Sequence, residues 1–246
     1  MNKKTTLLTL TIITTIIIAT TLTTLTQVNS QPTTEINIIN PTNPTNPTAK
    51  DGNFKFTTTT TPIGFKFNVT LWVSNWGTPP VYGWQAGIYY NSTTINATRA
   101  WTAQGDPTYL MHGHSTFGPA PSLTPGRVTM GATSLDTSAT PPPDPAKLGT
   151  LEFQIKLAPT AGGKISSNLI IDNADTYLLD DSLTEIPITK TGGLYEYTAP
   201  AIPDFTITAS PYSLSIMQSG SDTSTINVTS KGGFNQAVSL TVTGAP

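Results

Sequence analysis

The sequence predicts an all-β protein, with a β-sandwich followed by a shorter β segment. Charged residues make up only 11% of the 246 residues, below the ~25% of typical domains. Threonine, serine, asparagine, proline and glycine are abundant, which favours short strands joined by many turns. Apolar and polar residues alternate in several segments, and no comparably long segment shows a helical period.

Composition also limits the ways in which the fold can be held together and the partners it can bind. The chain has no cysteine, so burial rather than a disulfide framework must stabilise it. Its net charge is −2, and Lys3 and Lys4 are its only cluster of basic residues. Nucleic acid is therefore excluded as a partner, because the electrostatic footprint that it requires is missing.

The N-terminus has the pattern of an export signal. Lys3 and Lys4 precede an uncharged run over residues 7–25, and Ser30 supplies a small residue before Gln31. We therefore expect a signal peptide over residues 1–30 and an extracellular or cell-surface location. A buried core segment and an uncleaved membrane anchor are the alternatives, although repeated threonines weaken membrane insertion.

A proline-rich stretch follows the signal. Residues 40–48 repeat Asn-Pro-Thr three times, and proline removes a backbone donor and favours extended backbone. We expect residues 31–51 to form a Pro/Thr-rich spacer with no core of its own.

The strands of the larger domain are predicted from alternation. Clear cases lie at residues 65–73, 82–90 and 151–157, and weaker ones at 127–133 and 165–172. The residues expected to point inward are Phe65, Phe67, Val69, Leu71 and Val73, then Tyr82, Trp84, Ala86, Ile88 and Tyr90, then Leu151, Phe153, Ile155 and Leu157.

Beyond residue 203 the same alternation of apolar and polar residues appears in shorter segments. Four short strands are expected, at residues 205–209, 214–216, 226–228 and 238–242. Residues 199–203 carry two prolines and are expected to form a linker. Since a free-standing sandwich commonly has about seven strands, residues 204–246 are expected to be part of a domain.

Several segments resemble cohesin modules. Residues 67–75 and 82–91 are similar to the opening hairpin of that family, residues 149–156 to its central strand, and residues 175–187 to versions found in archaeal surface proteins. The resemblance implies a jelly-roll β-sandwich over residues 52–198 and a role in docking a dockerin-like protein or a polysaccharide. Tyr90-Asn91 replaces the usual Tyr-Asp, and no residue here matches a known partner contact, so the ligand does not transfer with the fold.

The tail resembles a second family. Residues 203–234 are similar to the first half of an immunoglobulin-like repeat common in large prokaryotic surface proteins. The resemblance implies a partial immunoglobulin-like β segment over residues 204–246.

Candidate catalytic and metal-binding residues have simpler explanations. Gly113 to Phe117 nearly forms a hydrolase nucleophile elbow, but Phe117 stands where a second glycine is needed. His112 and His114 have no matched third metal ligand nearby, so a polar loop is expected. An acidic cluster consists of Asp172, Asp175, Asp180 and Asp181. Its carboxylates could offer oxygens to calcium, but the formation of turns explains the spacing of these residues more simply.

We assign no catalytic residue, metal or cofactor. A carboxylate pair such as Asp181 and Glu185 leaves a glycoside hydrolase as the third function class, with nothing that singles the pair out.

Aromatic residues on polar faces are the candidate binding residues. Alternation places Trp72 and Tyr89 on the polar face of strands expected to be adjacent, where a ring could stack on a sugar or contact a protein. Coverage by a neighbouring loop or strand is the alternative. Trp76, Trp101 and Tyr109 are further candidates for the rim of such a site.

Four Asn-X-Ser/Thr sequons are candidate glycosylation sites, at Asn68, Asn91, Asn96 and Asn227. Asn68 and Asn227 both fall on the expected outward face of a strand, which agrees with modification.

These observations together predict a secreted, non-catalytic binding or scaffolding protein at the cell surface. Its partner is expected to be a dockerin-like protein or a polysaccharide. A carbohydrate-binding module of a polysaccharide-degrading system is the alternative.

Overall fold

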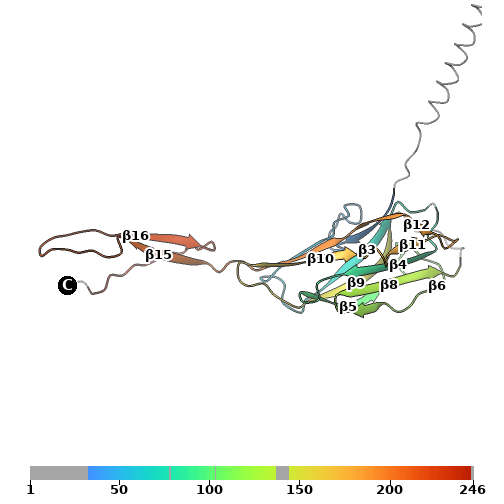
Figure 1. The fold of residues 1–246 in the computed structure, drawn as a ribbon, viewed down its shortest axis with the longest axis horizontal. Helices are drawn as coiled ribbons and strands as arrows, with labels where there is room; N and C mark the ends of the chain where they lie inside the picture. The colour runs from blue at the N-terminus through green and yellow to red at the C-terminus, as the bar shows by residue number, and fades with distance from the viewer. Residues whose placement is uncertain (1–32, 78, 103, 137–143, 245–246) are drawn as a thin grey trace, which may run out of the picture. The chain divides into compact units, whose positions relative to one another are not determined.

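The structure is a computed structural model that describes residues 33–77, 79–102, 104–136 and 144–244. The signal peptide expected at residues 1–30 lies outside the described residues. Every regular element in the described part is a β-strand, and the strands form three sheets (Figure 1). In this part of the chain no helix is long and apolar enough to cross a bilayer. The predicted all-β class is confirmed.

One sheet of the sandwich has five strands in the order β13-β1-β3-β9-β5. The long strands β3 and β9 pair antiparallel at its centre, whereas β1 and β13 pair in parallel. Its strands are β1 (Thr34–Ile39), β3 (Lys66–Ser74), β5 (Ile95–Trp101), β9 (Ala146–Ile155) and β13 (Ile188–Thr191).

The other sheet has nine strands arranged around β4 (Gly83–Tyr89). One edge of β4 pairs with β8, and its other edge pairs with β10 and β11. Of the remaining strands, two pair with the other edge of β8, one pairs with β11, and two continue the sheet beyond β10. The other members are β2 (Asn53–Thr57), β6 (Thr116–Phe117), β7 (Ser122–Thr124), β8 (Arg127–Ser134), β10 (Lys164–Ile171), β11 (Tyr177–Leu179), β12 (Glu185–Ile186) and β14 (Gly193–Thr198).

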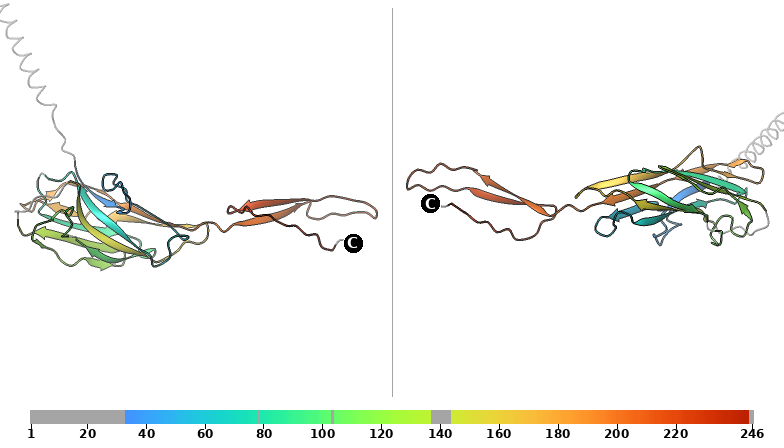
Figure 2. Two further views of the ribbon diagram at one scale, coloured as in Figure 1. Left: turned by 180° about the vertical axis from the view of Figure 1, so that it is seen from behind. Right: turned by 90° about the horizontal axis from the view of Figure 1, so that it is seen from below.

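The two sheets pack face to face over one hydrophobic core (Figure 2). Phe67 of the five-stranded sheet stacks on Tyr195 of the nine-stranded sheet, with ring centroids 5.7 Å apart. Phe67 also stacks on Phe153, and Tyr90 meets Phe153 edge-on at 5.1 Å. Aromatic side chains from both sheets thus pack together between the two layers. Such packing must stabilise a fold that has no disulfide.

Alternation correctly identified β3, β4, β8, β9 and β10 among the strands of the sandwich. The expected strands at 127–133 and 165–172 correspond to β8 and β10, and inward residues such as Leu71, Ile88 and Phe153 are fully buried. Phe65 and Leu157 are exceptions, because β3 begins at Lys66 and β9 ends at Ile155, which leaves both side chains exposed. The predicted jelly-roll β-sandwich is confirmed as the fold class.

The expected spacer over residues 31–51 is wrong in its extent. Residues 34–39 form β1, which pairs antiparallel with β3 inside the five-stranded sheet. Ile36 and Ile38 of β1 are fully buried, so this segment belongs to the core.

The Asn-Pro-Thr repeat is folded into turns rather than extended. The Asn40 side chain accepts hydrogen bonds from the backbone and hydroxyl of Thr42, and Asn43 accepts the same pair from Thr45. The Asn46 amide then donates to the carbonyls of Asn40 and Asp51. Asparagine side chains favour such turns because they substitute for backbone partners, and here they close the loop that leads from β1 to β2.

The C-terminal segment contains a single β-hairpin. Strands β15 (Asp204–Ser210) and β16 (Thr225–Lys231) pair antiparallel and match two of the four expected strands. The expected strands at 214–216 and 238–242 are not present in the structure. Every residue of β16 is exposed, so the hairpin has no buried core of its own.

Candidate partner-binding face

The outer face of β4, β8 and β10 is a surface that could receive a partner. Side chains alternate along each strand, so the residues between core positions point away from the other sheet. Pairing aligns Ile170 of β10 with Tyr89 of β4, and Tyr89 with Arg127 of β8. These three side chains therefore form one row across the sheet, which we call the Tyr89 row.

The Tyr89 row exposes apolar surface. Tyr89 is 43% exposed and Ile170 is 53% exposed, although both lie in the middle of a paired sheet. The Arg127 guanidinium lies over the Tyr89 ring, 5.4 Å from its centroid. Such a contact contributes about 0.5 to 1 kcal/mol at an exposed site and holds the ring in place.

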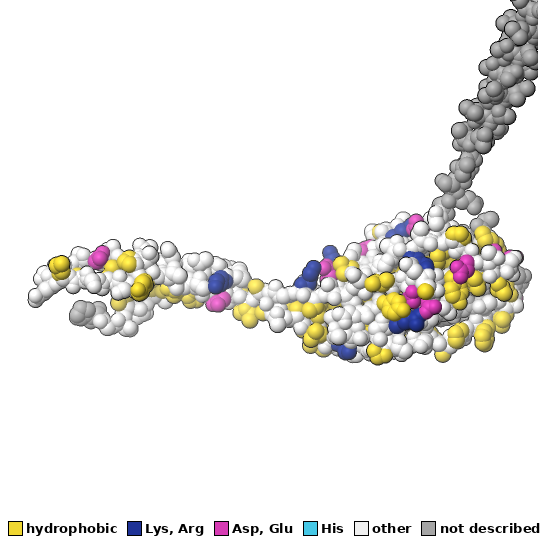
Figure 3. Space-filling model, in the orientation of Figure 1, with side chains coloured by type: hydrophobic (Ala, Val, Ile, Leu, Met, Phe, Trp, Pro, Cys, Tyr) yellow, Lys and Arg dark blue, Asp and Glu magenta, His cyan; other side chains and the backbone are white. Residues whose placement is uncertain are grey.

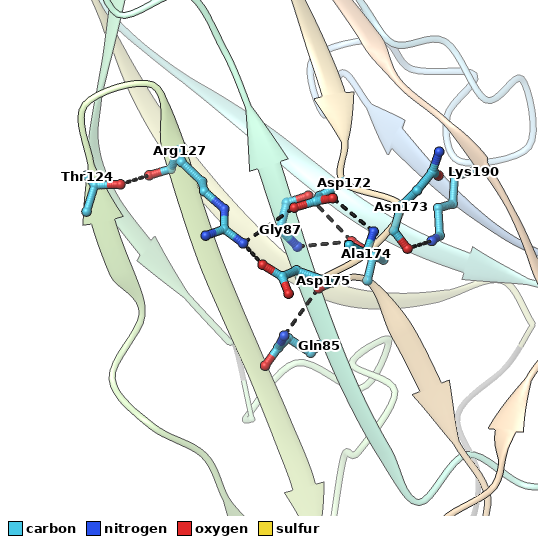
Figure 4. A network of polar contacts seen from close by, with 10 residues as sticks. Gln85, Gly87, Thr124, Arg127, Asp172, Asn173, Ala174, Asp175 and Lys190 are labelled. Carbon is cyan, nitrogen blue, oxygen red and sulfur yellow. Dashed lines mark hydrogen bonds and ion pairs between the residues drawn. The ribbon is translucent and has the colours of Figure 1, made fainter.

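Arg127 is itself held by two carboxylates (Figure 4). Its Nη2 lies 3.4 Å from Asp172 Oδ2 and forms an ion pair with Asp175. Both aspartates belong to the connection between β10 and β11, which passes beside β4 and places their side chains close to Gly87. These contacts thus connect Arg127 of β8 to the segment between β10 and β11.

A glycine allows this connection to lie close to β4. A Cβ at Gly87 would stand 3.2 Å from the Asp172 Cβ and 3.3 Å from the Asp175 Cβ, tighter than ordinary contacts. The Gly87 N–H donates to the Thr176 hydroxyl at 3.0 Å, and the Asp172 carboxylate accepts the Ala174 N–H at 2.9 Å. The Asp172 and Asp175 side chains are therefore fixed in position before any partner arrives.

A shallow hollow of about 300 Å³ lies on the same face, towards β6 and β11. Its walls contain no charged residue, and exposed Phe117 stands at its side. The lining includes Phe117, Pro119, Thr129, Thr133, Tyr177 and Leu179. Figure 3 shows that charged side chains on the sandwich gather in a few small groups among hydrophobic and uncharged ones. The hollow is therefore suited to an occupant that offers apolar and uncharged polar groups.

Trp72 and Tyr89 do not share a face. The expectation that their strands are adjacent is wrong, because β3 pairs with β1 and β9, whereas β4 belongs to the other sheet. Trp72 instead shares the outer face of the five-stranded sheet with Trp101, on either side of β9. The Lys147 ammonium lies 5.4 Å from the Trp72 ring centroid, and the Arg99 guanidinium lies 4.7 Å from the Trp101 ring centroid.

The two remaining aromatic candidates are parts of the core. Tyr109 is fully buried, and burial raises the pKa of its hydroxyl, so it does not form a rim. Trp76 is half-buried and packs against the core cluster.

The residues considered for catalysis or metal binding have structural partners. His114 Nδ1 lies 2.9 Å from Asp136 Oδ1 and 3.1 Å from Ser134 Oγ. Both contacts use the same ring nitrogen, whereas a catalytic relay uses the two nitrogens separately. His112 Nδ1 lies 3.1 Å from a backbone carbonyl.

The acidic residues of the predicted cluster are divided between two turns. Asp180 accepts the Ser182 and Thr184 N–H groups at 2.9 and 2.8 Å, which is the turn-forming role expected. Asp181 and Glu185 are both exposed at this turn. Among the described residues no group of three or more histidine, aspartate or glutamate side chains is placed to hold a metal.

Sequence reasoning missed the Arg127 network and Ile170. Arg127 is 45 residues from Asp172 in the chain, and only strand pairing brings them together. Ile170 stands next to buried Ile171, so its outward direction depends on the register of β10. The alternation in residues 164–169 is the one local signal that could have identified it.

No family model and no curated protein matches the chain. The solved structures similar to it include cohesins. CaCohA2 from Clostridium acetobutylicum is 18% identical over 68% of this chain and 92% of its own, with a TM-score of 0.48. A non-cellulosomal cohesin from the archaeon Archaeoglobus fulgidus is 10% identical, with coverages of 68% and 92% and a TM-score of 0.46.

A third similar structure comes from a type I cohesin–dockerin complex of Clostridium thermocellum. It is 12% identical, with coverages of 68% and 94% and a TM-score of 0.48. These likenesses concern the fold and assign no ligand to this chain.

Proposed function

We propose that this chain is a non-catalytic binding module, exported to the cell surface, that docks a protein partner through the outer face of β4, β8 and β10. The observation that carries the proposal is the Tyr89 row. It presents an exposed aromatic and an exposed aliphatic side chain side by side on rigid strands, with an arginine and two aspartates at its edge. Buried aromatic and arginine residues dominate the energy of protein interfaces, so this composition supports a protein partner.

Rigid placement supports the same conclusion. The strands that carry Tyr89, Arg127 and Ile170 are paired on both sides, and Arg127 is held by Asp172 and Asp175. A face that is already ordered loses little conformational entropy when a partner binds. The face is therefore better suited to direct docking than to folding around a ligand.

The test uses dockerins as probes, because the sequence motifs of residues 67–91 resemble cohesins. Immobilised dockerins from Clostridium acetobutylicum and Clostridium thermocellum are titrated with the chain in biolayer interferometry. We expect saturable binding to at least one dockerin, weakened about tenfold or more by Tyr89→Ala or Ile170→Ala.

Two variants serve as matched controls. Leu157→Ala and Tyr212→Ala remove exposed side chains that do not belong to β4, β8 or β10, and both should leave binding within about twofold of the parent. Equal weakening by control and face variants would overturn the proposed face. If the chain binds none of the dockerins, a dockerin-like partner is excluded.

A second candidate function is polysaccharide binding, on the opposite sheet. Trp72 and Trp101 lie on one outer face, both half-buried, with Thr150 of β9 paired to Trp101 between them. Planar aromatic rings on one face can stack on sugar rings. This arrangement would suit a module of a polysaccharide-degrading system.

Affinity electrophoresis in gels that contain soluble polysaccharides tests this candidate. Retardation that is lost in both Trp72→Ala and Trp101→Ala, and kept in Tyr89→Ala, would support it. Unchanged migration of the parent chain in every polysaccharide would count against it.

A further inference from the structure

The four glycosylation sequons lie in different structural settings. Asn68 lies in β3 opposite Glu152, and Asn96 lies in β5 opposite Gln154. Both are therefore inside the ladders of the five-stranded sheet. A transferase must take the acceptor asparagine and the two residues after it into its own active site, which would require these strands to separate.

The hydroxyl groups of these two sequons are also engaged. Thr70 is buried, and its hydroxyl donates to the Ile39 carbonyl at 3.0 Å and accepts from the Trp72 indole. The Thr98 hydroxyl donates to Glu152 Oε1 at 2.6 Å. In the folded chain both hydroxyls are thus tied to segments distant in the sequence, and that of Thr70 is buried as well.

Asn91 is placed differently. It stands two residues after the end of β4, in the turn that leads to β5, and its side chain is exposed, as is that of Asn68. The backbone N–H and the hydroxyl of Thr93 both donate to Asn91 Oδ1, at 3.0 and 2.7 Å. With the oxygen engaged, the amide nitrogen Nδ2 has no hydrogen-bond partner among the described residues.

The turn is held by a small set of hydrogen bonds. It is closed by the Thr94 and Ile95 N–H groups, which donate to the Asn91 carbonyl at 3.1 and 3.2 Å, and by the Ser167 hydroxyl, which accepts the Asn91 N–H. Local openings of this kind cost less free energy than separation of paired strands in a sheet.

We infer that Asn91 is an acceptor for an N-linked oligosaccharide in the folded protein, whereas Asn68 and Asn96 are protected. The sugar donor is an oligosaccharide on a polyprenyl phosphate or pyrophosphate. Nδ2 of Asn91 forms a bond to C1 of the first sugar, and the bond from C1 to the donor phosphate oxygen breaks. The lipid phosphate leaves with the electron pair, and the amide proton passes to a carboxylate base of the transferase.

Two other turns of the chain have the same hydrogen-bond geometry as the Asn91 turn. Asn40 and Asn43 make the same two hydrogen bonds with Thr42 and Thr45, at 3.0 and 2.7 Å. Proline stands between asparagine and threonine in both, which excludes them as acceptors, whereas Ser92 occupies that position after Asn91. Ser92→Pro would therefore convert the Asn91 turn into a copy of these non-acceptor turns.

The experiment glycosylates the folded chain in vitro and maps the products by peptide mass spectrometry. The substrate carries Asn227→Gln, so that only three sequons remain. A purified oligosaccharyltransferase and its lipid-linked donor are chosen because they modify synthetic peptides of all three sequons. We expect occupancy at Asn91 to exceed that at Asn68 and Asn96 by about tenfold or more, and the heat-unfolded chain to be modified at all three.

Ser92→Pro should abolish modification at Asn91 and leave the circular dichroism spectrum unchanged. Equal occupancy of Asn68 or Asn96 in the folded chain would overturn the inference. An unmodified Asn91 in the folded chain, with all three peptides modified, would also overturn it.

Discussion

Phe153 shows how a single side chain connects the two sheets. It lies on β9, is fully buried, and contacts the rings of Phe67 and Tyr90 from both layers of the sandwich. Since the chain has no disulfide, the stability of the sandwich depends on contacts of this kind.

Phe153→Ala should lower the free energy of unfolding by about 3 to 5 kcal/mol, because it removes buried apolar surface and leaves a cavity. Urea titration followed by tryptophan fluorescence measures the change. Leu157→Ala, which truncates an exposed residue just beyond the same strand, is the control and should change stability by less than about 1 kcal/mol. A loss below about 1 kcal/mol in Phe153→Ala would show that this position is not in the core.

Asp106 is the charged residue with the most altered ionisation. Burial raises its pKa, but hydrogen bonds from Lys147 and Thr108 outweigh burial and lower the pKa from 3.8 to about 2. The Lys147 ammonium lies 2.5 Å from Asp106 Oδ2, and this pair holds the loop that carries buried Tyr109.

Asp106→Asn should therefore destabilise the protein in a pH-dependent way. The stabilisation is fully present above about pH 4 and is lost as pH falls through about 2, because the folded carboxylate has the lower pKa. After allowance for screening by solvent, we expect a loss of about 1 to 2 kcal/mol at pH 7. Thermal melts of both forms should differ at pH 7, and the difference should shrink markedly near pH 2. An equal difference at both pH values would refute this role.

At the scale of elements, the β15–β16 hairpin differs from the strands of the sandwich. Ile207 pairs with Val228 and Ala209 with Ile226, so one face of the hairpin is apolar, yet Ile207, Val228 and Ile226 are 42–49% exposed. An isolated two-stranded hairpin is at best marginally stable in water.

Hydrogen exchange should separate the two regions. Amides of Ile226 and Val228 are expected to exchange at least about tenfold faster than those of Leu151 to Ile155 in β9, as are those of Leu240 and Val242. Exchange is followed by mass spectrometry of the whole chain. Equal protection in both regions would show that residues 204–246 form a finished fold.

Strand alternation is local, and the sequence therefore predicted the central strands well. Each of β3, β4 and β9 carries its own period of two, which can be read without knowledge of its neighbours. Pairing depends on distant segments, which is why Trp72 and Tyr89 were assigned to one face although they lie on different sheets. Short strands such as β6 and β12, each of two residues, have too few positions to show a period.

At the scale of the whole molecule, we propose a secreted protein with a sandwich, a linker at residues 199–203 and an immunoglobulin-like segment. Export is expected from the uncharged run behind Lys3 and Lys4, which lies outside the described residues.

Mass spectrometry of material secreted by an expressing cell tests the export signal. We expect a mature N-terminus near Gln31, because Ser30 is the small residue at the end of the signal. An intact chain that begins at Met1 or Asn2 would show an uncleaved membrane anchor instead.

The sequence by itself determined the all-β class, the core-facing residues of the main strands and the lack of disulfides, since these follow from composition and from a period of two. Only the tertiary structure decided that residues 34–39 belong to the sandwich and that Tyr89, Arg127 and Ile170 form one row. It also decided which sequon lies in a turn and which lie within ladders. The physical reason is that burial and pairing are set by segments far apart in the chain, whose register no local pattern contains.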